Sequence, residues 1–109
     1  MSLTETSVIT RYFEASARRD IDAVVASFSE EALVVDENHT YHGSQEIREW
    51  QEGVASIYEY TTQILDTKRL DEKSYLVIGR LTGNFPGGIA DLQYRFVIHN
   101  DLIERLEIV

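Results

Sequence analysis

The first part of the chain carries apolar residues at helical spacing. Ser2 and Glu5 have the spacing of a capping box, and the apolar positions that follow lie on one side of a helix. This pattern predicts a first helix that ends near residues 18–19, where two arginines suit a helix C-terminus. Asp20 is then expected to cap a second, short helix whose buried stripe includes Phe28. Because the connection between these two helices is so short, we expect them to pack at an angle to each other.

A strand and a third helix are predicted in the middle of the chain. The run Leu33–Val35 is apolar and rich in β-branched residues, and it ends in two acids, the first of which is Asp36. A polar loop is expected next, and then a helix that has Ser44 as its N-cap and continues to about residue 58. Trp50 lies on the apolar stripe of this helix. An acid at the end of a buried strand is therefore placed beside an inward-facing tryptophan.

The remainder of the chain changes to extended patterns separated by turn signals. Its clearest strand alternates, with Leu92, Tyr94 and Phe96 on one face and Gln93 and Arg95 on the other. Clusters of polar residues, or of proline and glycine, mark the turns between strands. The strands predicted from these signals cover residues 59–70, 75–85, 89–99 and 102–109.

These elements predict one α+β domain over residues 1–109, with three N-terminal helices and a meandering antiparallel sheet. Gly79 and Gly83 share one face of their strand, which indicates a bend in that strand or space for another group. A strongly curved sheet wrapped around helices leaves room inside. We therefore expect a sheet that encloses a pocket.

The composition narrows the possible functions. The 109 residues carry 19 acids and 10 bases, a net charge of −9, which opposes binding to nucleic acids and to anionic membrane surfaces. The chain has no cysteine, which excludes disulfides, thiolate zinc sites and cysteine nucleophiles. No apolar run approaches the roughly 20 residues of a membrane span, and the N-terminus lacks a signal-peptide pattern. These features favour a cytoplasmic address.

Three segments carry further motifs: VITRYFEASARRDIDAVVASFSEEALVVD, YHGSQEIREW and LQYRFVIHNDLIERLEIV. They contain a helix–Asp–helix opening, a G-x-x-x-I-R-E-aromatic start of a helix, and a Y-x-F strand before a short final strand. In these motifs, and over nearly its whole length, the chain resembles the nuclear transport factor 2-like superfamily of SnoaL-like proteins and ketosteroid isomerases. The resemblance implies a cone-shaped sheet around three helices. It specifies the fold better than the activity, because this fold hosts many functions.

Ketosteroid isomerase is the nearest functional parallel in that superfamily, and the resemblance implies roles for individual residues. In those enzymes an Asp after the first strand is the base, and a Tyr on the first helix donates to the developing oxyanion. Asp36 matches the base and Tyr12 matches the donor. A protonated acid on a later strand completes the family's site, but Leu92 occupies the matching position here. Asp91 is adjacent, and strand alternation directs it to the opposite face.

Each of these assignments has a structural alternative. Asp36 is either a general base in an apolar pocket, where desolvation favours its protonated form, or an acid that caps a loop and meets water. Tyr12 is either an oxyanion donor or a core tyrosine whose hydroxyl bonds a neighbour. His39 and His42 are metal-ligand types, but they lie on a predicted loop with no helix to fix them, so no metal site is predicted. The predicted pocket walls are Phe13, Phe28, Trp50, Tyr58, Leu92, Tyr94 and Phe96.

Three hypotheses for function follow. The first is an isomerase or cyclase that transfers a proton on a small hydrophobic carbonyl compound without a cofactor. The second is a non-catalytic pocket protein that binds a small apolar ligand. The third is an interaction module that forms a homodimer through the outer sheet face, with Ile78 and Val97 at the interface. Dimerisation is compatible with all three, and a pocket protein of this superfamily is the prediction.

Overall fold

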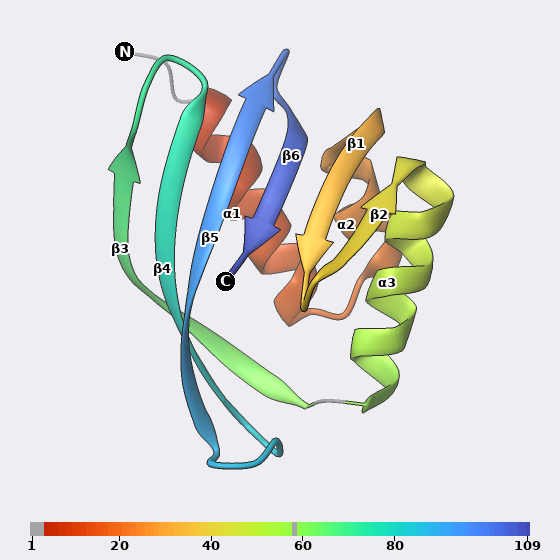
Figure 1. Ribbon diagram of the computed structural model, residues 1–109, viewed down its shortest axis with the longest axis vertical. Helices are drawn as coiled ribbons and strands as arrows, with labels where there is room; N and C mark the ends of the chain where they lie inside the picture. The colour runs from red at the N-terminus through yellow and green to blue at the C-terminus, as the bar shows by residue number, and fades with distance from the viewer. Residues whose placement is uncertain (1–3, 58) are drawn as a thin grey trace.

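The computed structural model describes residues 4–57 and 59–109 (Figure 1). Ser2 of the predicted capping box and Tyr58 of the predicted pocket wall lie outside the described residues. The helices are α1 (Thr4–Ala17), α2 (Ile21–Ala26) and α3 (Gly43–Ile57). The strands are β1 (Phe28–Asp36), β2 (His39–His42), β3 (Tyr60–Arg69), β4 (Ser74–Gly83), β5 (Ile89–His99) and β6 (Leu102–Ile108). The predicted α+β class is confirmed.

The strands of the described residues form one six-stranded sheet in the order β2-β1-β6-β5-β4-β3. Strands β3 to β6 make the antiparallel meander that the turn signals predict. β1 forms a hairpin with β2 on one side and runs parallel to β6 on the other. The sheet is therefore antiparallel except where its first and last long strands meet. No short turn fixes the relative direction of these two strands, because most of the chain lies between them.

Helices α1 and α2 lie behind the curved sheet, and α3 lies beside β2 (Figure 1). α1 packs against β3, β5 and β6, and α3 packs against β1 and β2. The apolar stripe of α1 and the inward face of β5 meet in the core between these layers. No helix of the described part of the chain has the length and apolarity to cross a membrane. The largest fully buried side chains are Phe96, Ile47, Ile103, Leu106, Val8, Val24, Val34 and Val77.

The second helix is shorter than its sequence pattern predicts. Asp20 caps α2 as expected, because its carboxylate accepts a hydrogen bond from the Ala23 N–H at 3.1 Å. Beyond the helix, the Ser27 carbonyl accepts a hydrogen bond from the Ile103 N–H of β6 at 2.8 Å. The chain thus joins the sheet early, and Phe28 begins β1 rather than ending α2.

The polar loop that was predicted after β1 is a tight hairpin. Glu37 and Asn38 have left-handed φ angles of 52° and 64° and form the turn, a geometry that suits the twist of antiparallel strands. His39 and the residues after it then pair with β1 as the short edge strand β2. Neither turn position holds glycine, so the sequence signal for this hairpin is weak. Gly43, with φ 84°, connects β2 directly to α3, which begins one residue before the predicted cap Ser44.

β3 and β4 approach each other closely at the lower end of the sheet in Figure 1. A Cβ added at Gly83 would lie 2.3 Å from the Glu59 backbone oxygen, so a larger residue would force the backbone to move. Asn84 secures the same place: its N–H donates to the Glu59 oxygen at 3.1 Å, and its side-chain oxygen accepts from the Glu59 N–H at 3.0 Å. This glycine therefore marks a close approach of two backbone segments.

Candidate functional site

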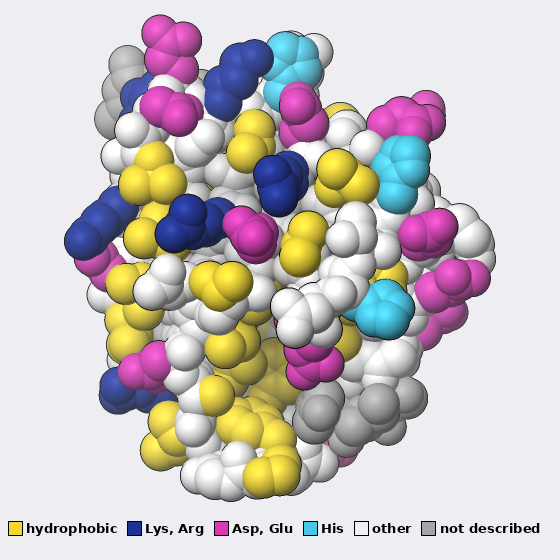
Figure 2. Space-filling model, in the orientation of Figure 1, with side chains coloured by type: hydrophobic (Ala, Val, Ile, Leu, Met, Phe, Trp, Pro, Cys, Tyr) yellow, Lys and Arg dark blue, Asp and Glu magenta, His cyan; other side chains and the backbone are white. Residues whose placement is uncertain are grey.

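A cavity of about 260 Å³ lies between α1, α3 and the inner face of the sheet. Figure 2 shows a hollow with hydrophobic side chains below the centre of the molecule and acidic side chains at its edge. The wall is mixed, with apolar side chains from several strands and polar groups on both sides. The lining residues are Tyr12, Asp36, Glu37, Trp50, Gln51, Val54, Tyr60, Leu81, Phe85, Ala90, Leu92, Tyr94 and Ile108.

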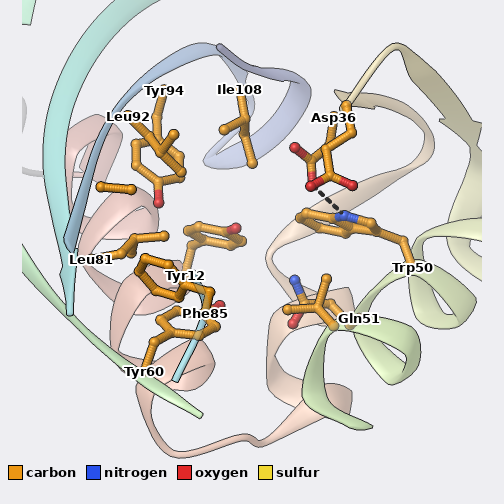
Figure 3. A pocket seen from close by; sticks show the side chains of 13 residues that line it. Tyr12, Asp36, Trp50, Gln51, Tyr60, Leu81, Phe85, Leu92, Tyr94 and Ile108 are labelled. Carbon is orange, nitrogen blue, oxygen red and sulfur yellow. Dashed lines mark hydrogen bonds between the residues drawn. The ribbon is translucent and has the colours of Figure 1, made fainter. Parts of the chain in front are cut away.

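Asp36 lines this cavity at the end of β1, and Trp50 of α3 holds it there. The Trp50 Nε1–H donates a hydrogen bond to Asp36 Oδ2 at 3.0 Å (Figure 3). Indole N–H is a donor only, so this bond fixes the orientation of the carboxylate. Among the described residues, no donor pairs with Oδ1. One carboxylate oxygen is therefore held, and the other is available to a ligand.

Three tyrosine side chains lie across the cavity from Asp36: Tyr12 from α1, Tyr60 from β3 and Tyr94 from β5 (Figure 3). Burial raises the pKa of Tyr12 well above its usual value, and Tyr94, Tyr60 and Asp36 add to this shift. Burial also raises the pKa of Tyr94, with smaller contributions from Tyr60 and Asp36. Phenols with raised pKa values stay protonated at neutral pH. The cavity thus has an acceptor on one side and hydrogen-bond donors on the other.

The hydroxyl of Tyr12 is open to the cavity although its ring is buried. The ring packs edge-on against Phe28 and Phe96, with centroid distances of 5.8 Å and 5.7 Å. No described residue hydrogen-bonds the hydroxyl. Tyr12 lines the cavity, and in Figure 3 its hydroxyl is directed to the side where Asp36 and Trp50 lie. The packed ring holds the donor in place, and a ligand can accept from it.

Leu92 lines the cavity where the resemblance placed a protonated acid in ketosteroid isomerases. The adjacent Asp91 points to the outer face, as strand alternation predicts. There it accepts two hydrogen bonds from Arg80 of β4, at 2.8 Å and 3.0 Å. The Arg80 guanidinium lowers the pKa of the exposed Asp91 carboxyl, chiefly through these hydrogen bonds. Asp91 is therefore committed to an outer ion pair and does not serve the cavity.

Three phenylalanines that were predicted as pocket walls are not among the lining side chains. Phe28 and Phe96 are buried behind the Tyr12 ring. Phe13 packs edge-on against Tyr12 and Tyr94, at 5.1 Å from each ring centroid. The sequence pattern correctly predicted that these rings face inward. The tyrosine rings, however, lie between them and the cavity. They support the tyrosines and do not line the cavity.

Several lining residues were not named by sequence reasoning. Gln51 is buried at 5% exposure, and in Figure 3 its side chain points toward the cavity. Its signal was its place beside Trp50 on the inner side of α3, where a buried amide is unusual. Tyr60 opens β3, and Phe85 lies in the turn between β4 and β5. Both lie at the ends of long strands. The pair Gly79 and Gly83 indicated a bend in β4, but the sequence does not show which side chains such a bend brings to the cavity.

The two histidines of β2 do not act together. Three positions apart on a strand, His39 and His42 point to opposite faces. His39 stacks on Tyr41 at 5.4 Å, and His42 Nε2 lies 2.9 Å from a carboxylate oxygen of Glu31 on β1. Both side chains are exposed. In the described part of the chain, no group of three metal-ligand side chains gathers.

Solved structures share this fold. A candidate polyketide cyclase from Sinorhizobium meliloti is 31% identical to this chain, with 94% of each chain covered and a TM-score of 0.89. A protein from Catenulispora acidiphila with a ketosteroid isomerase-like fold, in complex with trimethylamine, is 15% identical over 94% of this chain and 83% of its own, with a TM-score of 0.84. The epoxide hydrolase/cyclase-like enzyme SalBIII, which has a role in pyran ring formation in salinomycin, is 19% identical over 95% and 88%, with a TM-score of 0.83. The last two likenesses concern the fold alone.

No curated protein matches the chain. The model of the SnoaL-like domain family matches residues 9–104, which includes the described helices and strands apart from the start of α1 and the larger part of β6. This match agrees with the ketosteroid isomerase-like fold of the solved structures. The chain belongs to the SnoaL-like domain family.

Proposed function

We propose that this protein binds a small, hydrophobic carbonyl compound and moves a proton on it without a cofactor. The observation that carries the proposal is that an oriented carboxylate, Asp36, and a phenol, Tyr12, line opposite sides of one cavity, and that no residue of 4–57 or 59–109 hydrogen-bonds this phenol. Proton transfer next to a carbonyl needs a base near the carbon and a donor near the oxygen. The family match and the likeness to a candidate polyketide cyclase support chemistry of this class.

The proposed reaction uses Asp36 Oδ1 as the base. It removes a proton from the carbon next to the carbonyl, and the electron pair of that C–H bond forms an enolate. The Tyr12 hydroxyl donates a hydrogen bond to the enolate oxygen, where the negative charge develops. The proton on Asp36 then returns to the same or another carbon, which gives exchange or isomerisation. Trp50 keeps its hydrogen bond to Oδ2, so the carboxylate does not have to reorient between the steps.

The size of the cavity limits the ligand. Its volume of about 260 Å³ lies just below the roughly 300–1,000 Å³ of typical small-molecule sites. The walls near Leu81, Leu92 and Ile108 are aliphatic, while Phe85 and Tyr60 offer ring faces. We infer a flat ligand of one or two rings that carries its oxygen toward the tyrosines.

Binding of β-naphthol, a two-ring mimic of an enol, tests the pocket. Tyr12→Phe removes one hydrogen bond to the mimic's oxygen, and we expect its affinity to fall roughly threefold to tenfold. Fluorescence titration measures the dissociation constants. Tyr41→Phe is a matched control, because Tyr41 packs against Trp50 but does not line the cavity. Failure of the unaltered protein to bind the mimic, or equal losses in both variants, would count against the proposal.

A second candidate function is ligand binding without catalysis, and Leu92 favours it. Loss of one preorganised donor commonly lowers the catalytic rate of an enzyme by a factor of about 10²–10³. An aliphatic side chain in that position suits retention of an apolar ligand. This alternative expects the same naphthol binding but no proton exchange above the rate in buffer. The two functions are therefore separated by an exchange measurement rather than by affinity.

We propose in addition that two copies of the chain associate through the outer face of the sheet. Leu76, Ile78 and Val97 are only half-buried on this face, between charged residues such as Arg95. Burial of such apolar side chains stabilises an interface. Figure 2 shows hydrophobic and charged side chains interspersed over this part of the surface.

Sedimentation at several concentrations tests the dimer. We expect the chain to sediment at about twice its 12.5 kDa. Ile78→Lys places a charge in the centre of the interface and should yield monomers, because an unpaired charge is costly to bury. Gln45→Lys adds the same charge on the exposed side of α3 and should leave the dimer intact. A monomer in the unaltered protein at high concentration would refute the interface.

A further inference from the structure

Tyr94 is a second phenol in the cavity, two residues beyond Leu92 on the inner face of β5. Alternation along a strand puts residues two apart on the same face. Its side chain is 5% exposed, and in Figure 3 its hydroxyl points into the cavity beside the Tyr12 ring. No described residue hydrogen-bonds this hydroxyl. It is therefore a donor without a hydrogen-bond partner in the described part of the chain, next to the Tyr12 donor.

The ring of Tyr94 is held by its neighbours, and one of them is a glycine. A Cβ added at Gly79 of β4 would lie 3.0 Å from Tyr94 Cε1, so the absent side chain at this position leaves room for the phenol. Phe13 contacts the ring edge-on at 5.1 Å, and Phe96 stacks on it with an interplanar angle of 15°. Packing on three sides limits where the ring can go. The hydroxyl is consequently positioned before a ligand arrives.

The geometry points to Tyr94 as the donor that takes the place of the acid absent at position 92, so that Tyr94 and Tyr12 together bind the carbonyl or enolate oxygen of the ligand. This inference rests on the proposed function and extends it. Residue 92 is aliphatic, and Asp91 is paired on the other face, so neither supplies a donor. Tyr94 reaches the same cavity from the same strand face.

A phenol differs chemically from the acid that it replaces. A carboxylic acid donates only while a strongly raised pKa keeps it protonated, whereas a phenol is neutral at pH 7 without special help. Burial raises the pKa of Tyr94 further, which keeps the donor protonated over the whole neutral range. Because a phenol is ordinarily the weaker acid, the stabilisation of an enolate should be smaller. We therefore expect a site selective for ligands with an acidic or already delocalised enol.

Binding of β-naphthol to Tyr94→Phe, Tyr12→Phe and the double variant tests the inference in the full chain. Two donors to one oxygen should couple, so each single change should weaken binding roughly threefold to tenfold, and the double change should differ from the product of the two. Ultraviolet absorbance of the bound mimic reports its ionised fraction. That fraction should fall in Tyr94→Phe, a change that a purely structural role of the ring would not produce.

Gly79→Ala is a positioning control that keeps both hydroxyls. The added methyl group must displace the Tyr94 ring by a few tenths of an ångström, so the ionised fraction should lie between those of the unaltered protein and Tyr94→Phe. Tyr41→Phe should change neither quantity. Normal binding and ionisation in Tyr94→Phe, alongside losses in Tyr12→Phe, would overturn the inference and leave the proposed function standing. Absence of naphthol binding in the unaltered protein would defeat both.

Discussion

Replacement of Asp36 by asparagine is expected to slow proton exchange on a two-ring ketone such as β-tetralone by a factor of about 10²–10⁴, the usual contribution of a general base. Asparagine has nearly the same shape, and its side-chain oxygen can still accept the Trp50 hydrogen bond. The variant therefore loses the base and keeps the local structure. Loss of the α-proton signal in deuterated water, followed by NMR, measures the rate.

Glu37→Gln provides the matched control for this experiment. Glu37 is the next residue, also lines the cavity and carries the same charge, but its side chain is exposed in the turn before β2. Its replacement should change the exchange rate only slightly. Undiminished exchange in Asp36→Asn would show that Asp36 is not the base. Exchange at the buffer rate in the unaltered protein, with naphthol still bound, would favour the non-catalytic binding protein.

Replacement of Phe96 by alanine should lower the free energy of unfolding by about 3–5 kcal/mol, the range found for fully buried aromatic residues. Phe96 has no exposed surface and contacts three other rings, those of Tyr12, Phe13 and Tyr94. Alanine would leave a void among them. Because small domains are stable by only about 5–15 kcal/mol, this change approaches the limit of folding.

Urea unfolding at one fixed protein concentration measures this effect. Ile89→Ala on the same strand is the control, because Ile89 is 62% exposed and its truncation should alter stability by roughly 0.5 kcal/mol or less. If Phe96→Ala and Ile89→Ala were equally stable, the packing of Phe96 against the rings of Tyr12, Phe13 and Tyr94 would not stabilise the core as expected. Phe96→Ala should also weaken naphthol binding, since Phe96 packs against the rings of both proposed donors, Tyr12 and Tyr94.

Local patterns in the sequence were sufficient for most of the fold. The alternation around Leu92 and Tyr94 gave β5 its inner and outer faces, and it placed Asp91 outside, where the structure pairs it with Arg80. The hairpin at Glu37 was missed, because two residues without glycine rarely form such a turn. Local signals fail where tertiary pairing stabilises a backbone conformation that the residue types alone do not favour.

The site was harder to predict than the fold, for a geometrical reason. Periodicity tells which face of an element is inward, but it does not tell how deep a side chain lies. Phe96 and Tyr94 share one strand face, yet only Tyr94 reaches the cavity. The Trp50–Asp36 hydrogen bond depends on the placement of α3 against β1, and Phe85 reaches the wall through the bend of the long strands. Such relations depend on how separate elements pack against each other, and the spacing of residues within one element does not encode them.

The hydrogen bond between Trp50 and Asp36 has a practical consequence. The chain contains one tryptophan, and its indole N–H is hydrogen-bonded to a carboxylate that lines the cavity. The emission of an indole depends on the charge and polarity next to its N–H. Any event that protonates, displaces or covers this carboxylate is thus reported by a single chromophore that needs no label. The fluorescence of Trp50 therefore reports changes in the cavity, which allows ligands to be screened before a substrate is identified.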